Sequence, residues 1–423
     1  MTTTVPQPQT VRQETTSCCI AGCGPAGAVL GLLLARAGVD VLVLEKHEDF
    51  FREFRGDTIH PSTLQVIDEL GLGERFAAVP QQRVSQLAAL TDEGMVTVAD
   101  FSSLHVAHPY IALVPQWDFL DFLTDAAAEL PSFELRMRAE VVDVLETRGR
   151  VSGVRYRADD GLHEVGATLT VAADGRDSAV RRSVGLEPVP YGAPMDVLWF
   201  RLSREETDPD ETFARVSAGH IVAMIQRGDY WQVGYVIPKG AEAALRRRGI
   251  ETLRASLADL MPVFAGRTER EPASWDEVKT LEVQVNRLRR WHRPGLLCLG
   301  DAAHAMSPVA GVGINLAVQD AVAAANLLAE PLVRGTLTER DLARVGRRRW
   351  LPTMVTQAFQ RAVQRRVLEP VLRGGGGAAP RVLRSLARIP LLLRIPARLI
   401  GLGVLAEHVR VRATTAGARG GRA

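Results

Sequence analysis

Three glycines near the start of the chain, Gly22, Gly24 and Gly27, have the spacing G-x-G-x-x-G, and Glu45 follows them by about 20 residues. Gly22 permits a tight turn, Gly24 lets a pyrophosphate approach the backbone, and Gly27 lets a helix pack against a strand. Glu45 can accept from a ribose hydroxyl. An incidental glycine-rich turn is the alternative. The pattern favours an adenine-dinucleotide site without separating NAD from FAD.

Two further acids follow apolar runs. Asp174 follows the run 167–173 and starts an Asp-Gly pair, and Asp301 ends Gly300-Asp301 after a second apolar run. Each acid is expected at the carboxyl end of a parallel strand, where ligand crevices form in open α/β sheets. For Asp174 alone, an ordinary turn is the competing interpretation.

The loop after Asp301 contains Pro308, Gly311 and Gly313, and a helix is predicted to start at about Ile314. Glycines at a helix N-terminus leave bare N–H groups, which suit a delocalised anion. Reduced flavin is such an anion.

The elements that must position these residues are visible in the hydrophobic pattern. A strand, a glycine turn, a helix from about Pro25 and a buried strand over 41–44 form one β-α-β unit. A hairpin is predicted around residues 92–94, a helix after Pro115, and a small antiparallel meander over 133–156. Alternating strands in 195–279 indicate a second, mostly antiparallel sheet.

Length and composition support two soluble domains. The chain has 423 residues, 46% hydrophobic and 24% charged, and a net charge of +2, which gives no footprint for nucleic acid. No zinc or other metal site is expected, because the four cysteines form no C-x-x-C pair. The expected organisation is a tail, 1–16; a cofactor domain, 17–84 plus 110–190 plus 280–368; a substrate sheet, 85–109 plus 191–279; and a linker with an amphipathic helical tail, 369–423.

The second sheet supplies the candidate substrate residues. They are aromatic, basic or apolar side chains on its predicted strands, and ordinary packing is the alternative for each: Trp199, Arg201, His220, Met224, Trp231 and Tyr235. His220 or Tyr235 could deprotonate a phenol, but the sequence assigns no general base.

The C-terminal tail is apolar with regular arginines and two prolines. It is expected to pack on its own protein, to line the substrate entrance, to mediate self-association or to touch a membrane surface. The expected location is the cytoplasm, with peripheral membrane contact left open.

From about Ser17 to Leu368 the chain resembles the group A FAD-dependent aromatic monooxygenases, which are built like para-hydroxybenzoate hydroxylase. The glycine turn with Glu45, the Asp174-Gly175 pair and Gly300-Asp301 occur in that family's order. The resemblance implies an α/β fold with α+β elements: a Rossmann-like FAD-binding domain with an inserted antiparallel substrate sheet.

The resemblance also implies roles for individual residues. The first turn would hold the ADP part of FAD, Arg55 and Gln116 its central portion, and Asp301 its ribityl chain. Asp174 would serve both FAD and NAD(P)H. The cofactor-binding set it implies is Gly22, Gly24, Pro25, Ala26, Gly27, Glu45, Lys46, Arg55, Gln116, Asp174, Gly300, Asp301, Gly311, Val312, Gly313, Ile314 and Asn315. The flavin-ring loop would present Pro308, Gly311 and Gly313.

The activity implied is NADPH- or NADH-dependent use of O2 to hydroxylate or epoxidise an aromatic or polycyclic natural product, through a flavin C4a-hydroperoxide. A flavin-dependent halogenase or reductase, or a non-catalytic FAD-containing interaction protein, are the alternatives. The sequence contains no W-x-W-x-I-P segment, which speaks against a halogenase.

Overall fold

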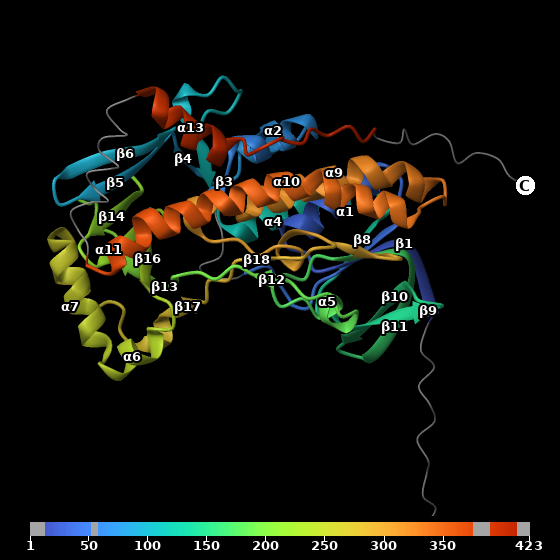
Figure 1. Cartoon of the computed structure of the whole chain (residues 1–423), viewed down its shortest axis with the longest axis horizontal. Coiled ribbons are helices and arrows are strands. Elements are labelled where there is room, and N and C mark those ends of the chain that lie inside the picture. Colours follow the sequence, from blue (N-terminus) through green and yellow to red (C-terminus); the bar gives the residue numbers. More distant parts are fainter. Residues whose placement is uncertain (1–12, 52–57, 375–389, 413–423) are drawn as a thin grey trace, which may run out of the picture.

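A computed structural model of the chain describes residues 13–51, 58–374 and 390–412. Two large β-sheets lie toward opposite ends of the molecule, as Figure 1 shows. Two long helices, α9 (Gly313–Val333) and α10 (Glu339–Val363), pack on one another. They run along the molecule between the two sheets (Figure 1), so they tie the two parts together.

The first sheet has eight strands, with five neighbours in the order β20-β11-β1-β2-β8 all parallel. Its strands are β1 (Gln13–Ala21), β2 (Val41–Leu44), β8 (Phe133–Arg136), β9 (Glu140–Thr147), β10 (Arg150–Ala158), β11 (Gly161–Ala172), β19 (His292–Arg293) and β20 (Leu296–Cys298). All four residues of β2 are buried, as expected of a parallel strand covered on both faces.

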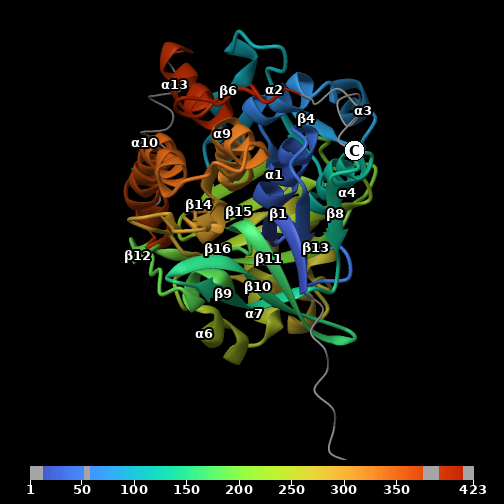
Figure 2. The same cartoon turned by 90° about the vertical axis from the view of Figure 1, so that its right-hand side faces the viewer.

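Helices cover one face of this sheet, and Figure 2 shows α1 and α9 above β1. Helix α1 (Pro25–Arg36) packs between α9 and α4 (Gln116–Ala128). Ten consecutive residues of α1, Ala26 to Ala35, are buried, so this helix has no solvent face over most of its length. The antiparallel strands β9 and β10 lie on the side of β11 away from α1 and α9 (Figure 2), and the short α5 (Ala179–Ser183) packs against β9.

The second sheet has seven strands in the order β17-β13-β16-β15-β14-β5-β6. The hairpin β5–β6 joins through a parallel pairing of β5 with β14, and the other pairings are antiparallel. The strands are β5 (Gln86–Thr91), β6 (Gly94–Asp100), β13 (Met195–Ser203), β14 (Phe213–Ser217), β15 (His220–Gln226), β16 (Tyr230–Pro238) and β17 (Lys279–Leu281).

Short helices cover one face of the second sheet. They are α6 (Glu242–Arg247), α7 (Ile250–Leu260) and α8 (Ala265–Thr268). Phe200 and Trp231 from the sheet and Leu257 of α7 share one fully buried apolar core with them. We call this side the helix-covered face and the opposite side the front face.

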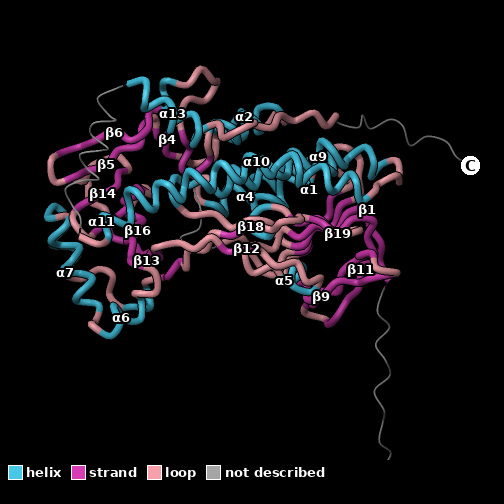
Figure 3. The backbone as a smooth tube through the Cα atoms, viewed as in Figure 1, coloured by secondary structure: helices cyan, strands magenta, loops and turns pink. Residues whose placement is uncertain are grey.

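Smaller elements complete the chain (Figure 3). They are α2 (Pro61–Glu69), α3 (Gly73–Ala77), α11 (Glu369–Leu372), α13 (Pro390–Gly401), β3 (Thr58–Ile59), β4 (Gln82–Val84), β7 (Ile111–Leu113), β12 (Val189–Pro190) and β18 (Asn286–Arg287). Among the described residues, one stretch, Val309–Val333, is long and apolar enough to span a bilayer, and 83% of its most apolar window is buried inside the protein. It serves as a core helix.

The α/β fold predicted from the sequence is confirmed, and two details are corrected. The tail was expected to extend to Thr16, but β1 already begins at Gln13, where it pairs with β11. A backbone ladder can continue beyond the apolar core, so the polar side chains there did not signal a strand. The segment 133–136 was expected in an antiparallel meander, but β8 pairs in parallel with β2.

Candidate functional site

The glycine turn between β1 and α1 has no room for side chains at two of its three glycines. Gly22 has a φ of +94°, and a Cβ there would lie 2.6 Å from the carbonyl oxygen of Ala173. A Cβ at Gly27 would lie 2.0 Å from the carbonyl oxygen of Gly22. At Gly24 a Cβ would meet no atom within 4 Å. Gly24 therefore borders open space at the N-terminus of α1, where a phosphate is favoured.

The carboxylate of Glu45 is tied directly to this turn. Its Oε2 accepts from the backbone N–H of Cys23 at 2.9 Å, and its Oε1 accepts from the backbone N–H of His47 at 3.2 Å. Each oxygen keeps a second lone pair for a ribose hydroxyl. Lys46, the next residue, is exposed.

Asp174 lies at the end of the strand next to β1 and packs against Gly22. Its Oδ2 accepts from the backbone N–H of Val180 at 3.2 Å, while its buried Oδ1 has no hydrogen-bond partner among the described residues. Burial raises the pKa of Asp174, and hydrogen bonds from Ser178 and Val180 offset only part of this effect. A buried oxygen without a donor is costly, so a donor from a bound ligand fits this position.

The Asp174-Gly175 loop is joined to the Gly300-Asp301 motif by an arginine. Arg176 donates from Nη2 to Oδ2 of Asp301 at 3.2 Å. The buried Arg181 donates to the backbone oxygens of Ala302 at 3.0 Å and of Arg176 at 2.7 Å. The two acids that the sequence placed at strand ends therefore lie in one continuous polar edge of the sheet.

The N-terminal parts of α1 and α9 meet at Gly300. This glycine has a φ of +57°, and a Cβ on it would lie 3.2 Å from Cβ of Ala26 and 3.4 Å from Cβ of Ala317. The first N–H groups of both helices lack partners within the helix and carry a partial positive charge. Two such termini on one edge suit a long ligand with more than one anionic part.

The loop before α9 is held by hydrogen bonds to residues far away in sequence. Asn315 accepts at Oδ1 from the N–H of His60 at 2.8 Å and from the hydroxyl of Thr63 at 2.6 Å. Thr58 donates to the carbonyl oxygen of Gly311 at 2.8 Å, and a Cβ at Gly311 would lie 2.2 Å from that hydroxyl. Asn315 therefore shapes this loop with its side chain, which the resemblance did not imply.

The remaining residues of the predicted cofactor set are placed as follows. Val312 and Ile314 are buried in the apolar core, whereas a Cβ on Gly313 would meet no atom within 4 Å. Pro308 precedes the turn Val309–Gly311. Pro25 and Gln116 are the first residues of α1 and α4. Arg55 lies outside the described residues. The backbone and side chains described here fit an adenine dinucleotide with an anionic ring at its far end.

Four of the six predicted substrate residues point to the helix-covered face of the second sheet. Met224, Trp231 and Tyr235 belong to the core under the helix-covered face, and His220 hydrogen-bonds there through Nδ1 to the hydroxyl of Tyr235 at 2.7 Å. Strand residues alternate between faces, and the sequence does not show which face helices will cover. These four side chains pack in or beside the core there, which is the alternative stated for each of them, and we do not propose them as substrate contacts.

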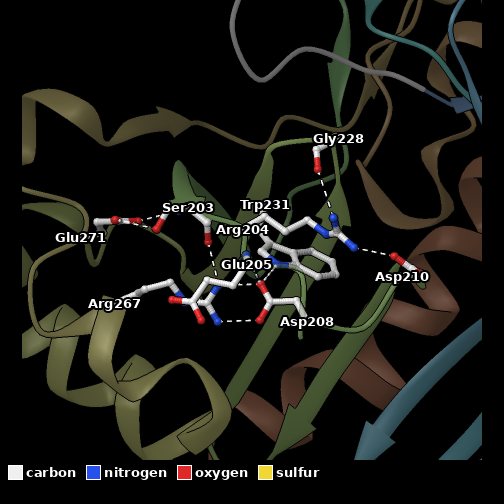
Figure 4. A network of polar contacts seen from close by, with 9 residues as sticks. All are labelled: Ser203, Arg204, Glu205, Asp208, Asp210, Gly228, Trp231, Arg267 and Glu271. Atoms are coloured by element: carbon white, nitrogen blue, oxygen red, sulfur yellow. Dashed lines mark hydrogen bonds and ion pairs between the residues drawn. The ribbon is translucent and has the colours of Figure 1, made fainter.

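Trp231 instead serves a buried ion pair, which Figure 4 shows with its neighbours. Its Nε1 donates to Oδ2 of Asp208 at 2.9 Å, and Arg267 binds both oxygens of that carboxylate, with Nη2 to Oδ1 at 2.6 Å. The Arg267 guanidinium helps to lower the pKa of Asp208 to about 2, against the opposing effect of burial. This network holds the segment after β13 against the sheet.

The front face carries the predicted residues Trp199 and Arg201 and also Ile225, which was not among the predicted substrate residues. Trp199 covers Gly234, where a Cβ would lie 2.9 Å from the indole ring. Ile225 shares a partly buried apolar cluster with Ala310 and Val312 of the loop before α9 and with Phe359 of α10. Arg201 lies at the exposed end of β13 and stacks on Tyr230 at 4.5 Å. Side chains along β15 alternate between the two faces, so the position of Ile225 on the front face follows once the face that contains Met224 is known to be covered.

No cluster of three metal-ligating side chains occurs among the described residues. All four cysteines are buried thiols. Burial raises the pKa of both Cys19 and Cys298 to about 12, so these thiols are poor nucleophiles near neutral pH.

Comparisons with known proteins agree with a flavin cofactor. The profile of the FAD binding domain family matches residues 15–357. A 6-methylpretetramide 4-monooxygenase of Streptomyces rimosus is 32% identical over 383 residues, which cover 89% of this chain and 90% of that protein. A 12-dehydrotetracycline 5-monooxygenase/anhydrotetracycline 6-monooxygenase of Streptomyces rimosus is 29% identical over 329 residues, covering 72% of this chain and 60% of that longer protein.

The fold is also shared with a solved structure. The anhydrotetracycline hydroxylase from Streptomyces rimosus superposes with a TM-score of 0.74 at 25% sequence identity, covering 92% of this chain and 76% of that one. The likeness therefore extends over both sheets and the helices between them.

Proposed function

This chain belongs to the FAD-dependent class A aromatic monooxygenases, and from that membership we propose that it uses NAD(P)H and O2 to hydroxylate or epoxidise a polycyclic phenol. The observation that carries the proposal is the contact between Arg176 and Asp301, because it joins the two motifs into one cofactor-binding edge. The similarity to enzymes named for tetracycline-type compounds supports a polycyclic rather than a single-ring substrate.

Bound FAD would supply the redox chemistry, accepting hydride from NAD(P)H and activating O2 for transfer to the substrate. The chain supplies position and electrostatics. The N–H groups at the start of α1 would hold its diphosphate, and Glu45 would accept from a ribose hydroxyl. Asp174 and Asp301 lie where hydroxyls of the cofactor and of NAD(P)H can be bound. The amides of Gly313 and Ile314 at the start of α9 would stabilise an anionic ring bound there.

The front face of the second sheet would position the substrate. Trp199 offers a flat apolar surface beside Gly234, and Ile225 lies in the cluster with Ala310 and Val312. Apolar walls exclude water from the reacting atoms, which protects the activated oxygen from loss. We accordingly propose that the first sheet with its helices is the cofactor unit and that the second sheet is the substrate unit.

A cytoplasmic location remains part of this proposal. The described part of the tail packs on the protein itself, since Ala397 and Ile400 of α13 are buried. That packing supports a role within the fold over the alternatives of membrane contact or self-association.

The proposal is tested by loading the purified chain with FAD and following NADPH and NADH oxidation with a panel of polycyclic phenols. We expect at least one of them to accelerate oxidation and to gain the mass of one oxygen atom. A product that gains a halide, or a substrate that gains two hydrogens, would instead favour the halogenase or reductase alternatives.

A further inference from the structure

A segment near the C-terminus packs against the flavin-ring loop and is linked through intervening side chains to the Gly300-Asp301 motif. Residues 390–412, which we call the C-terminal strap, comprise α13 and an extended stretch after it. In α13, Ala397 and Ile400 pack in the apolar cluster that contains Val312 of the flavin-ring loop. The carbonyl oxygen of Ile400 also lies 2.7 Å from Nδ1 of His60. The strap therefore covers the side of this loop.

The extended part of the strap inserts one acid into the core. Glu407 is 4% exposed. Arg348 binds its carboxylate in a bidentate way, with Nε to Oε1 and Nη2 to Oε2 both at 2.7 Å. The fully buried Arg349 lies 3.6 Å away, from Nη1 to Oε1. Removing one member of a buried ion pair leaves an uncompensated charge, so Glu407 has a large effect on its neighbours.

The charges continue from Arg349 to the Gly300-Asp301 motif. Arg349 donates from Nε to Oδ1 of Asp320 at 2.8 Å, and Oδ2 of Asp320 lies 2.5 Å from Nε2 of His304. His304 in turn donates its backbone N–H to the carbonyl oxygen of Gly300 at 2.9 Å. A chain of direct contacts therefore connects Glu407 to Gly300, and its longest step is the 3.6 Å between Glu407 and Arg349.

Asp320 binds Arg349 with one carboxylate oxygen and His304 with the other, and this gives Glu407 a way to affect His304 without contacting it. Glu407 places a second negative charge beside Arg349. The guanidinium is therefore attracted to two carboxylates, and it attracts Asp320 less strongly than it would if Asp320 were its single acidic partner. Without Glu407, the only acid still contacting Arg349 among the described residues is Asp320. The bond from Asp320 to His304 would weaken, and with it the turn that presents Asp301.

We propose that Glu407 is a positioning residue for the flavin: through Arg349, Asp320 and His304 it holds the Gly300-Asp301 turn in the conformation that binds the ribityl chain. The strap is then part of the cofactor site and not only a cover. This inference rests on the FAD site of the proposed function.

The test compares two substitutions that break different anchors of the same strap. Glu407→Gln removes the acid that leads to His304. Glu69→Gln is the matched control. Glu69 belongs to α2 and also anchors the strap, through Nδ1 of His408 and the N–H of Val409, both at 2.7 Å, and its side-chain hydrogen bonds to described residues include none with Arg349, Asp320 or His304. FAD affinity, the visible spectrum of bound flavin and its midpoint potential are measured for both variants and the wild type.

We expect Glu407→Gln to weaken FAD binding about tenfold, the size of a coupling between neighbours in one network, and to shift the flavin spectrum and potential. Glu69→Gln should bind FAD within about twofold of the wild type with an unchanged spectrum. Glu407→Asp, which keeps the charge, should lie between, and it decides the matter if Glu407→Gln does not fold. Wild-type affinity and spectrum in both Glu407 variants, or equal losses in Glu69→Gln, would overturn the inference. Failure of the wild type to bind FAD would overturn the proposed function as well.

Discussion

The guanidinium of Arg176 donates to the carboxylate of Asp301 at 3.2 Å, although 125 residues separate the two in sequence. Both side chains are only partly exposed, at 23% and 32%. The contact joins the loop after β11 to the loop after β20, two strands that pair in parallel. One polar edge thus carries both Asp174 and Asp301, the two acids that we propose bind the cofactor.

Replacing Arg176 should weaken FAD binding without unfolding the protein. Arg176→Ala leaves Asp301 without its fixed partner, and a partly exposed pair contributes up to about 1 kcal/mol, so we expect a loss of roughly two- to fivefold. Titration of the apoprotein with FAD measures it. Arg182→Ala is the control, since Arg182 is exposed and its guanidinium bonds, within the described part of the chain, to the backbone oxygen of Asp177 alone. Equal affinity in both variants would remove Arg176 from the site.

Two glycines of the first turn allow an effect on FAD binding to be distinguished from an effect on folding. In Gly24→Ala the new Cβ meets no protein atom, so the apoprotein should keep its melting temperature while losing FAD affinity by at least about tenfold. In Gly27→Ala the Cβ would lie 2.0 Å from the oxygen of Gly22, so the fold itself should be destabilised. Thermal melts of apoprotein and FAD titration together distinguish the two. Full FAD affinity in Gly24→Ala would contradict the placement of the diphosphate.

The ion pair of Asp208 with Arg267 should control stability at neutral pH. Asp208→Asn leaves the Arg267 guanidinium without its bidentate acid, which is expected to cost about 3 kcal/mol in the free energy of unfolding at pH 7. Denaturant unfolding measures this cost. Asp210→Asn is the control: its carboxylate is 89% exposed and pairs with the largely buried Arg204, and the substitution should change the free energy of unfolding by less than about 0.5 kcal/mol.

The pH dependence follows from the same pair. The pKa of Asp208 is lowered to about 2 in the folded state, against about 3.9 in an unfolded chain. A depressed folded-state pKa stabilises the protein above the unfolded value, and this stabilisation disappears as the pH falls from about 4 to about 2. By pH 3, the stability difference between wild type and Asp208→Asn should therefore shrink by roughly 1 kcal/mol. A difference that stays constant would contradict the assigned pair.

The face on which a residue lies should decide its effect on substrate binding. Trp199→Ala removes an aromatic surface from the front face and should raise KM for the phenol about tenfold, with a smaller effect on kcat. Tyr235→Phe, on the helix-covered face, should leave KM unchanged, although the hydroxyl loses its bond to His220. Steady-state kinetics on the same substrate compare the two. A larger increase in KM for Tyr235→Phe than for Trp199→Ala would indicate that Tyr235, and not the front face, contacts the substrate.

Much of the cofactor edge was predictable because its chemistry imposes local patterns. The glycines of the first turn, Glu45 and the acids after two apolar runs all lie where the sequence predicted. Close approach of backbone to backbone, as between Gly27 and Gly22, admits no other residue, so it leaves a visible motif.

The substrate side was less predictable for a physical reason. Alternation shows that Trp199 and Phe200 point to opposite faces, but only the tertiary fold decides that α7 covers the face of Phe200. The strap was equally hidden, because Glu407 has no local motif and finds Arg348 and Arg349 only through packing. Both the choice of covered face and the contacts of Glu407 depend on segments that are far apart in the sequence.

The measurement that tests the central claim most directly is oxygen transfer from isotopically labelled O2. The FAD-loaded chain is incubated with NADPH and the polycyclic phenol that most accelerates NADPH oxidation, and the product is analysed by mass spectrometry. The account predicts that one oxygen atom of the product carries the label and that its amount follows the NADPH consumed. A product whose oxygen comes from water, or NADPH oxidation that yields only hydrogen peroxide with every phenol tested, would contradict it.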